Sequence, residues 1–271
     1  PKEGCKQPER GCKQEVFKMK RGKPIIALAQ IKYFEESKDN NVEKIKKYIR
    51  LAKKENADIV CFPESCVHRK EILHFNHKLI NDIKEECKKN SIWCIISEDM
   101  KIDNKMYNTA ILINRTGKIK GNYRKINLYG DTEGLNAGKR PKVFKTDFAR
   151  IGIAICWDLA YPKLFRKMKM AGSEIVFCPS HWAYETKVHE KDHKEREIKI
   201  IESLIRARAF ENLFFIALCN PITKYKDQIA YSAIASPHRI LKELIDKEGL
   251  LISEINLSEI KKSHKIYEEA R

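Results

Sequence analysis

Short apolar runs alternate along the chain with longer segments in which apolar residues recur at helical spacing. The run from Ile25 to Ile31 is typical of a buried strand, whereas apolar residues recur every three or four positions between Val42 and Asn56, as in a helix. The same alternation continues to the end of the chain. It predicts further strands at 59–62, 92–97, 107–114, 118–123, 151–155, 174–178, 213–219, 230–235 and 250–255, and further helices at 72–89, 163–171, 198–211 and from Ser258 onwards.

This order of elements indicates an α/β protein with mixed sheets. The strands at 107–114 and 118–123 are joined by Arg115-Thr116-Gly117, as in a hairpin, while helices separate most of the others. No linker interrupts residues 24–271, so we expect one domain there. Residues 1–23 are rich in charge, lack a sustained period and are predicted to form a basic, flexible N-terminal tail.

Composition narrows the class of protein. The chain holds no apolar stretch long enough for a membrane span, and its nine cysteines are odd in number, scattered, and mostly within apolar runs. We therefore expect a soluble cytoplasmic protein with reduced thiols. The net charge of +17 could indicate nucleic acid as a partner, but acidic residues are interleaved with the basic ones and no nucleic-acid-binding motif occurs, so this partner is not favoured.

Three residues that can carry chemistry follow predicted strands. Cys156 follows the strand 151–155, in which Gly152 and Ala154 share its side and leave room for a substrate. Glu64 follows the strand 59–62 after a proline, and Lys125 follows the strand 118–123. Taken singly, each has an ordinary explanation: a buried cysteine, a carboxylate at a helix N-terminus, and a solvated lysine.

Together the segments around these residues resemble the nitrilase, or carbon-nitrogen hydrolase, superfamily. The resemblance rests on three motifs in the family's order, with supporting similarities at Asn108-Thr109-Ala110 and at Arg208 to Asn212. The motifs are Phe62-Pro63-Glu64, Tyr123-Arg124-Lys125-Ile126-Asn127-Leu128 and Gly152-Ile153-Ala154-Ile155-Cys156-Trp157-Asp158. The chain departs from the family at Asn127, where histidine is frequent, and at Lys163, where glutamate is frequent.

The resemblance implies a fold and a catalytic apparatus. It implies a four-layer α-β-β-α sandwich with two mixed sheets, a Glu64-Lys125-Cys156 triad, no metal or organic cofactor, and assembly into a homodimer or a larger homo-oligomer. The family also has a second glutamate between the lysine and the cysteine. Glu133 is the only glutamate in that interval and fits the family's spacing loosely.

The expected activity is hydrolysis of a carbon-nitrogen bond in a small amide or N-carbamoyl compound. Cys156 would attack the carbonyl carbon, Glu64 would transfer protons, and Lys125, with a backbone N–H near Trp157, would stabilise the oxyanion. Glu133 would orient the substrate or Lys125. Trp182 and Tyr184, which follow the strand after the nucleophile, are candidates for the wall of the substrate pocket.

Two other functions remain open from the sequence. His189-Glu190-Lys191-Asp192-His193 fits the pattern of zinc peptidases, although the residues around it are almost all charged, whereas a zinc-binding helix packs one face into a core. A zinc-dependent hydrolase using His189 and His193 is therefore one alternative. The other is a catalytically weak member of the family that acts as a binding or nucleic-acid-associated protein.

Overall fold

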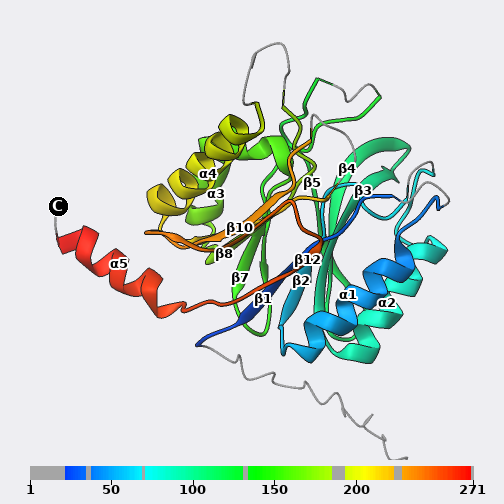
Figure 1. Ribbon diagram of the computed structural model, residues 1–271, viewed down its shortest axis with the longest axis horizontal. Helices are drawn as coiled ribbons and strands as arrows, with labels where there is room; N and C mark the ends of the chain where they lie inside the picture. Colours follow the sequence, from blue (N-terminus) through cyan, green and yellow to red (C-terminus); the bar gives the residue numbers. More distant parts are fainter. Residues whose placement is uncertain are drawn as a thin grey trace, which may run out of the picture.

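Two six-stranded sheets face each other in the computed structural model, which describes residues 22–34, 38–68, 71–130, 134–184, 193–222 and 228–269. Helices cover the outer face of each sheet, so that the layers run helix, sheet, sheet, helix (Figure 1). This arrangement confirms the predicted four-layer α-β-β-α sandwich.

The first sheet contains the N-terminal strands and one strand from near the C-terminus. Three neighbouring strands, β1 to β3, run parallel, and the outer strands pair antiparallel. From edge to edge the order is β12 (Gly249–Glu254), β1 (Ile25–Gln30), β2 (Ile59–Cys61), β3 (Trp93–Ile102), β4 (Lys105–Ile113) and β5 (Ile119–Arg124).

The second sheet repeats this plan. Its three central parallel strands, β7 to β9, are again flanked by antiparallel neighbours. Its order is β11 (Ile240–Ile245), β10 (Tyr231–Ala235), β9 (Phe215–Cys219), β8 (Ile175–Pro179), β7 (Arg150–Ile153) and β6 (Val143–Lys145).

Alternation of side chains along the strands explains the layering. In β1, Ile26 and Leu28 belong to the core between the sheets, while Ala27 and Ala29 pack in the core under the helices of the first layer. Burial on both faces explains why such strands are apolar at nearly every position. The apolar runs in the sequence therefore correspond to central strands of the two sheets.

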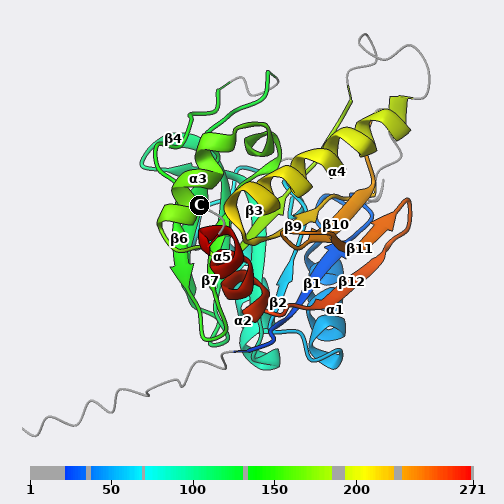
Figure 2. The same cartoon turned by 90° about the vertical axis from the view of Figure 1, so that its left-hand side faces the viewer.

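Five α-helices flank this core in the described part of the chain. In α1, three residues at helical spacing, Ile45, Ile49 and Ala52, are buried against the first sheet. The helices are α1 (Val42–Lys54) and α2 (Lys78–Asn90) on the first sheet, α3 (Pro162–Met170) and α4 (His193–Asn212) on the second, and α5 (Ser258–Glu269). The last helix contacts the end of α3 through His264 and Lys169 (Figure 2), and its Ser263 hydrogen-bonds at 2.8 Å to His238, which lies between β10 and β11. No helix in these ranges is both long and apolar enough to cross a bilayer.

Several predicted boundaries differ from the structure for local reasons. The helix predicted at 72–89 begins only at Lys78, where His77 caps it by accepting a hydrogen bond from the Leu79 N–H at 3.3 Å. Strand β3 continues beyond the predicted 92–97 because it forms a hairpin with β4 through Asp103 and Asn104, both with positive φ.

Strands β6 and β11 were not predicted. The first has only three residues, and β11 lies at the edge of the second sheet, where several of its side chains are exposed. Residues 1–21 lie outside the described ranges. The flexible tail at 1–23 and the single domain at 24–271 therefore remain predictions.

Candidate active site

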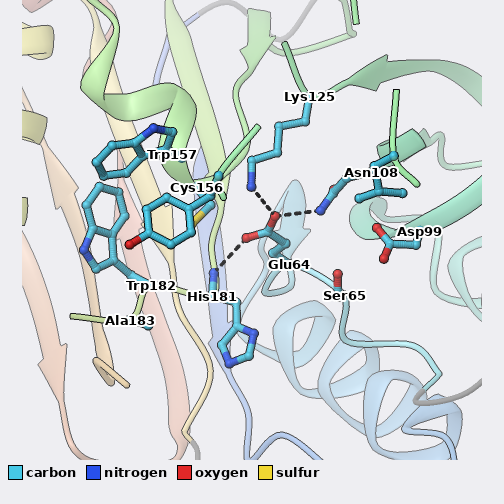
Figure 3. A pocket seen from close by; sticks show the side chains of 12 residues that line it. Glu64, Ser65, Asp99, Asn108, Lys125, Cys156, Trp157, His181, Trp182 and Ala183 are labelled. Atoms are coloured by element: carbon cyan, nitrogen blue, oxygen red, sulfur yellow. Dashed lines mark hydrogen bonds and ion pairs between the residues drawn. The ribbon is translucent and has the colours of Figure 1, made fainter. Parts of the chain in front are cut away.

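The three predicted catalytic residues all follow strands of the two facing sheets. Glu64 lies shortly after β2, Lys125 directly after β5, and Cys156 begins a short 3₁₀-helix, Cys156–Ala160, that follows β7. The structure brings their side chains to one cavity (Figure 3). All three are at least nine-tenths buried, so their charges interact with little screening by solvent.

The Glu64 carboxylate is the centre of the hydrogen-bond network in the cavity. Its Oε1 accepts hydrogen bonds from Lys125 Nζ at 2.8 Å and from Asn108 Nδ2 at 2.7 Å. Its Oε2 accepts one from the backbone N–H of His181 at 3.1 Å. Three donors, one of them charged, hold the carboxylate in a single orientation, and Oε2 keeps capacity for a proton.

The backbone at Cys156 adopts an uncommon conformation. Its φ is +44°, in the left-handed region that non-glycine residues seldom occupy. Such a turn is kept only where the surrounding structure fixes it, and it is frequent at functional sites. Here it lies at the start of the 3₁₀-helix that follows β7, and Figure 3 shows Cys156 beside Trp157 at the cavity.

Asp158 fixes this turn and ties it to the segment that carries Lys125. It is fully buried and accepts hydrogen bonds from the Ile155 N–H at 3.0 Å, the Tyr123 hydroxyl at 2.7 Å, and the Asn127 N–H and side-chain amide at 2.9 and 2.8 Å. Two of these partners flank Lys125 in the sequence. The sequence motif contains Asp158, but residue type alone did not indicate that it joins the two sheets.

Replacing Asp158 by Asn should lower both stability and turnover. An amide would place an N–H group against donors that now point at a carboxylate oxygen, leaving one or more buried donors unsatisfied, each at a cost of roughly 1–3 kcal/mol. Lys125 and Cys156 would then lose their relative placement, and we expect kcat to fall about tenfold. Thermal unfolding and steady-state kinetics would measure the two effects, and unchanged values for both would contradict this role.

Burial and neighbouring charges determine whether Lys125 and Cys156 are charged. Burial disfavours the charge on Lys125, but the negative charge of Glu64 and its hydrogen bond to the ammonium outweigh that effect, so the pKa of Lys125 is raised and its ammonium stays charged. For Cys156, burial and then the negative charge of Glu64 raise the thiol pKa to about 12, against the lowering effect of Lys125. Cys156 therefore rests as a thiol and needs a base to become a nucleophile.

The cavity has a volume of about 170 Å³ and two unlike sides. Aromatic rings form one side: Trp157 lies between Tyr129 and Trp182, with ring centroids 5.0 and 5.6 Å away. The Trp182 indole is fixed by a 2.7 Å hydrogen bond to buried Glu197 of α4. The remaining described lining is mainly polar: Glu64, Ser65, Asp99, Asn108, Lys125, Cys156 and His181, with Leu135 and Ala183.

The other predicted site residues fall in different places. Trp157 and Trp182 both line the cavity, whereas Tyr184 packs against the hydrophobic core and is not among the described lining residues. Glu133 lies outside the described ranges, as does His189, and for His193 only its place at the start of α4 is described. Within those ranges, no three His, Cys, Asp or Glu side chains are grouped as metal ligands would be.

Another buried carboxylate supports the loop that carries Glu64. Glu98 of β3 accepts hydrogen bonds from the backbone N–H groups of Val67 at 2.9 Å and His68 at 3.1 Å. Burial raises the pKa of Glu98 from its ordinary value of 4.5 to about 8, although these hydrogen bonds lower it. Nothing in the sequence around Glu98, between Ser97 and Asp99, indicated this contact.

This pKa predicts how stability depends on pH. Between about pH 4.5 and pH 8, Glu98 would be ionised in the unfolded chain and protonated in the folded one, so its contribution to the free energy of unfolding falls as pH rises. Denaturant unfolding of the unaltered protein and of Glu98→Gln across this range would measure the contribution. We expect the difference between the two proteins to change steadily with pH, and a constant difference would contradict the prediction.

Comparisons with known proteins show which family this chain is similar to. A model of the carbon-nitrogen hydrolase family matches residues 25–265. The 2-oxoglutaramate amidase of Bacillus subtilis (strain 168) is 26% identical over 248 residues, covering 85% of this chain and 91% of that protein. The deaminated glutathione amidase of Synechocystis sp. is 31% identical over 173 residues, covering 58% of this chain and 60% of that protein.

A solved structure shows the same fold. The crystal structure of Saccharomyces cerevisiae Nit3, a member of branch 10 of the nitrilase superfamily, superposes with a TM-score of 0.76 at 22% identity, covering 90% of this chain and 94% of that one. The family model spans nearly all of the described structure, including the three motifs. The chain therefore belongs to the carbon-nitrogen hydrolase family.

Proposed function

We propose that this protein hydrolyses a non-peptide carbon-nitrogen bond of a small amide or N-carbamoyl compound and releases ammonia through a thioester on Cys156. The observation that carries the proposal is the placement of Glu64. Its carboxylate is held by Lys125, Asn108 and the His181 N–H at the cavity that Cys156 also lines. A base, a fixed cation and a nucleophile at one buried cavity are the groups that amide hydrolysis requires.

In the first half of the reaction, Glu64 takes the thiol proton and the Cys156 sulfur attacks the carbonyl carbon. The carbonyl oxygen becomes an oxyanion, which Lys125 stabilises together with a backbone N–H near Trp157. Collapse of this intermediate breaks the carbon-nitrogen bond while Glu64 returns its proton to the departing nitrogen. Ammonia leaves, and the acyl group stays on sulfur as a thioester.

In the second half, Glu64 deprotonates a water molecule that attacks the thioester. The oxyanion forms again at the same position, and its collapse breaks the carbon-sulfur bond. The departing sulfur recovers the proton held by Glu64, and the acid product leaves. Glu64 is thus required twice, and the same residues would transfer the acyl group to an amine if an amine entered in place of water.

The cavity and the relatives together suggest which substrates to test. Its volume of about 170 Å³ suits a small molecule, and the aromatic side favours a flat or apolar portion. The two amidases to which the chain is similar are named for 2-oxoglutaramate and deaminated glutathione. N-carbamoyl amines remain our first candidate and aliphatic amides the second, and nitriles are less favoured.

A panel of these compounds would test the function directly. Ammonia release should occur with at least one amide or carbamoyl compound, should disappear after thiol alkylation, and should survive dialysis against a strong chelator. Loss of activity on chelation that zinc restores, with insensitivity to alkylation, would favour the alternative site at His189 and His193. Absence of turnover across the panel would favour a binding protein.

We also propose that the protein forms a homodimer or a larger homo-oligomer. Phe210 of α4 and Tyr267 of α5 contact each other, with ring centroids 5.7 Å apart, and yet are 50% and 39% exposed. Contiguous exposed apolar side chains are frequent at subunit interfaces. Sedimentation at several concentrations should show a species of at least twice the chain mass, and a monomer throughout would contradict this proposal.

A further inference from the structure

Asn108 contacts both members of the ion pair in the cavity. It lies on β4 and is 5% exposed. Its side-chain Nδ2 donates to Glu64 Oε1 at 2.7 Å, and its backbone carbonyl accepts the N–H of Lys125 at 2.9 Å. The other end of its amide, Oδ1, accepts a hydrogen bond from the buried Ser97 hydroxyl at 3.3 Å. The amide is therefore held at both ends, and Figure 3 shows it pointing at the carboxylate.

These contacts occupy the two oxygens of the Glu64 carboxylate unequally. A carboxylate has about four acceptor sites, roughly two on each oxygen. Oε1 accepts from two side chains, Lys125 and Asn108, whereas Oε2 has one partner among the described residues, the His181 N–H at 3.1 Å. A proton can therefore bond to Oε2 without displacing any of these donors. On Oε1 it would have to displace Lys125 or Asn108.

We propose that Glu64 carries the transferred proton on Oε2 and that Asn108 is the positioning residue that keeps Oε1 from taking it. The role rests on the proposed function, because only a Glu64 that transfers protons needs one oxygen reserved for them. When the thiol proton of Cys156 bonds to Oε2, Oε1 becomes the carbonyl oxygen of the neutral acid and keeps both of its donors. When the proton passes to the departing nitrogen, the carboxylate returns to its first state with the same donors in place.

The remaining donors would not reserve Oε2 without Asn108. The terminal torsion of a glutamate side chain is broad, so hydrogen bonds decide how its carboxylate is oriented. Loss of the Asn108 amide would leave one donor on each oxygen, Lys125 on Oε1 and the His181 N–H on Oε2. Both oxygens would then have room for a proton, and protonation would be divided between them. Proton transfer should slow, while binding of the substrate should change little.

Ammonia release by two Asn108 variants tests this role. Asn108→Ala removes the amide, and Asn108→Leu removes the donor but keeps the branched shape. We expect both to lower kcat roughly tenfold, as the loss of a hydrogen bond to a charged group predicts, and to change KM by less than about twofold. Asn212→Ala is the matched control: Asn212 is 2% exposed, its Nδ2 donates to the Arg208 carbonyl at 3.0 Å, and it does not line the cavity. It should lower thermal stability and leave kcat near that of the unaltered protein.

A double-mutant cycle with Glu64→Gln separates this role from a structural one. Acylation by an activated ester would be followed by mass spectrometry in each single variant and in the double variant. Asn108→Leu alone should slow acylation roughly tenfold, but it should slow it no further in the Glu64→Gln background, where no carboxylate takes a proton.

Two results would overturn the role of Asn108 alone. One is an unchanged kcat in Asn108→Leu, and the other is an equal further slowing of acylation in the Glu64→Gln background. Absence of both ammonia release and acylation in the unaltered protein would overturn the proposed function and this role with it.

Discussion

Replacing Cys156 by Ala should abolish turnover and leave the fold intact. Without the sulfur no thioester can form, so we expect kcat to fall by about 10³-fold or more, as for other enzymes that lose their nucleophile. Cys156 is 8% exposed and is the first residue of the 3₁₀-helix. Asp158 fixes this turn through the Ile155 N–H, a contact that does not involve the thiol. Steady-state ammonia release and thermal unfolding measure the two effects.

Cys94 offers a matched control for this substitution. It is also a buried thiol, but it lies on β3 in the core under α1 and α2, away from the residues that line the cavity. Cys94→Ala removes the same atoms from a packed site and should cost stability without changing kcat appreciably. Equal loss of turnover in both variants would show that Cys156→Ala lowers activity by disturbing the folded structure. Undiminished turnover in Cys156→Ala would exclude Cys156 as the nucleophile.

Replacing Glu64 by Gln should affect the two halves of the reaction unequally. The amide keeps the shape of the side chain but cannot take a proton, so amide turnover should fall by about 10³-fold. An activated ester has a leaving group that needs no proton, so it can still acylate the thiol slowly. Deacylation also needs Glu64, to activate water, and we expect the acyl-enzyme to accumulate and ester turnover to stop after one equivalent.

Glu86→Gln is the corresponding control. Glu86 is a buried carboxylate of α2, 5% exposed and paired with Arg50 at 3.1 Å, and it does not line the cavity. Its replacement removes one charge of a partly buried ion pair and should reduce stability without stalling deacylation. Continued ester turnover by Glu64→Gln at the rate of the unaltered protein would contradict the role of Glu64 as the base.

Much of the fold was predictable because its strands are buried on both faces. Central strands such as β1 and β8 appear in the sequence as apolar runs, and the helices that cover them show apolar residues at helical spacing. The edge strand β11 was not predictable in this way, since several of its side chains are exposed. Boundaries such as that of α2 depend on tertiary contacts that periodicity does not show.

The sequence predicted the parts of the site that are formed by reactive side chains, but not those formed by backbone groups. Glu64, Lys125 and Cys156 stand out because three motifs in a family's order occur at strand ends. The N–H of His181 left no signal, because any residue except proline supplies one. Asn108 was recognised only as a supporting similarity, although its amide bonds directly to Glu64. Asn108 is far from Glu64 in the sequence, and the pairing of β3 with β4 is what brings the two side chains together.

The most direct test of the mechanism is to locate the covalent intermediate. Glu64→Gln would be exposed to an activated acetyl ester, digested, and analysed by peptide mass spectrometry. We predict one added acetyl group, on the peptide that contains Cys156, and none on that peptide when Cys156→Ala is combined with Glu64→Gln. An adduct confined to a peptide with a different cysteine, or no adduct while ester turnover continues, would contradict the assignment of Cys156 as the nucleophile.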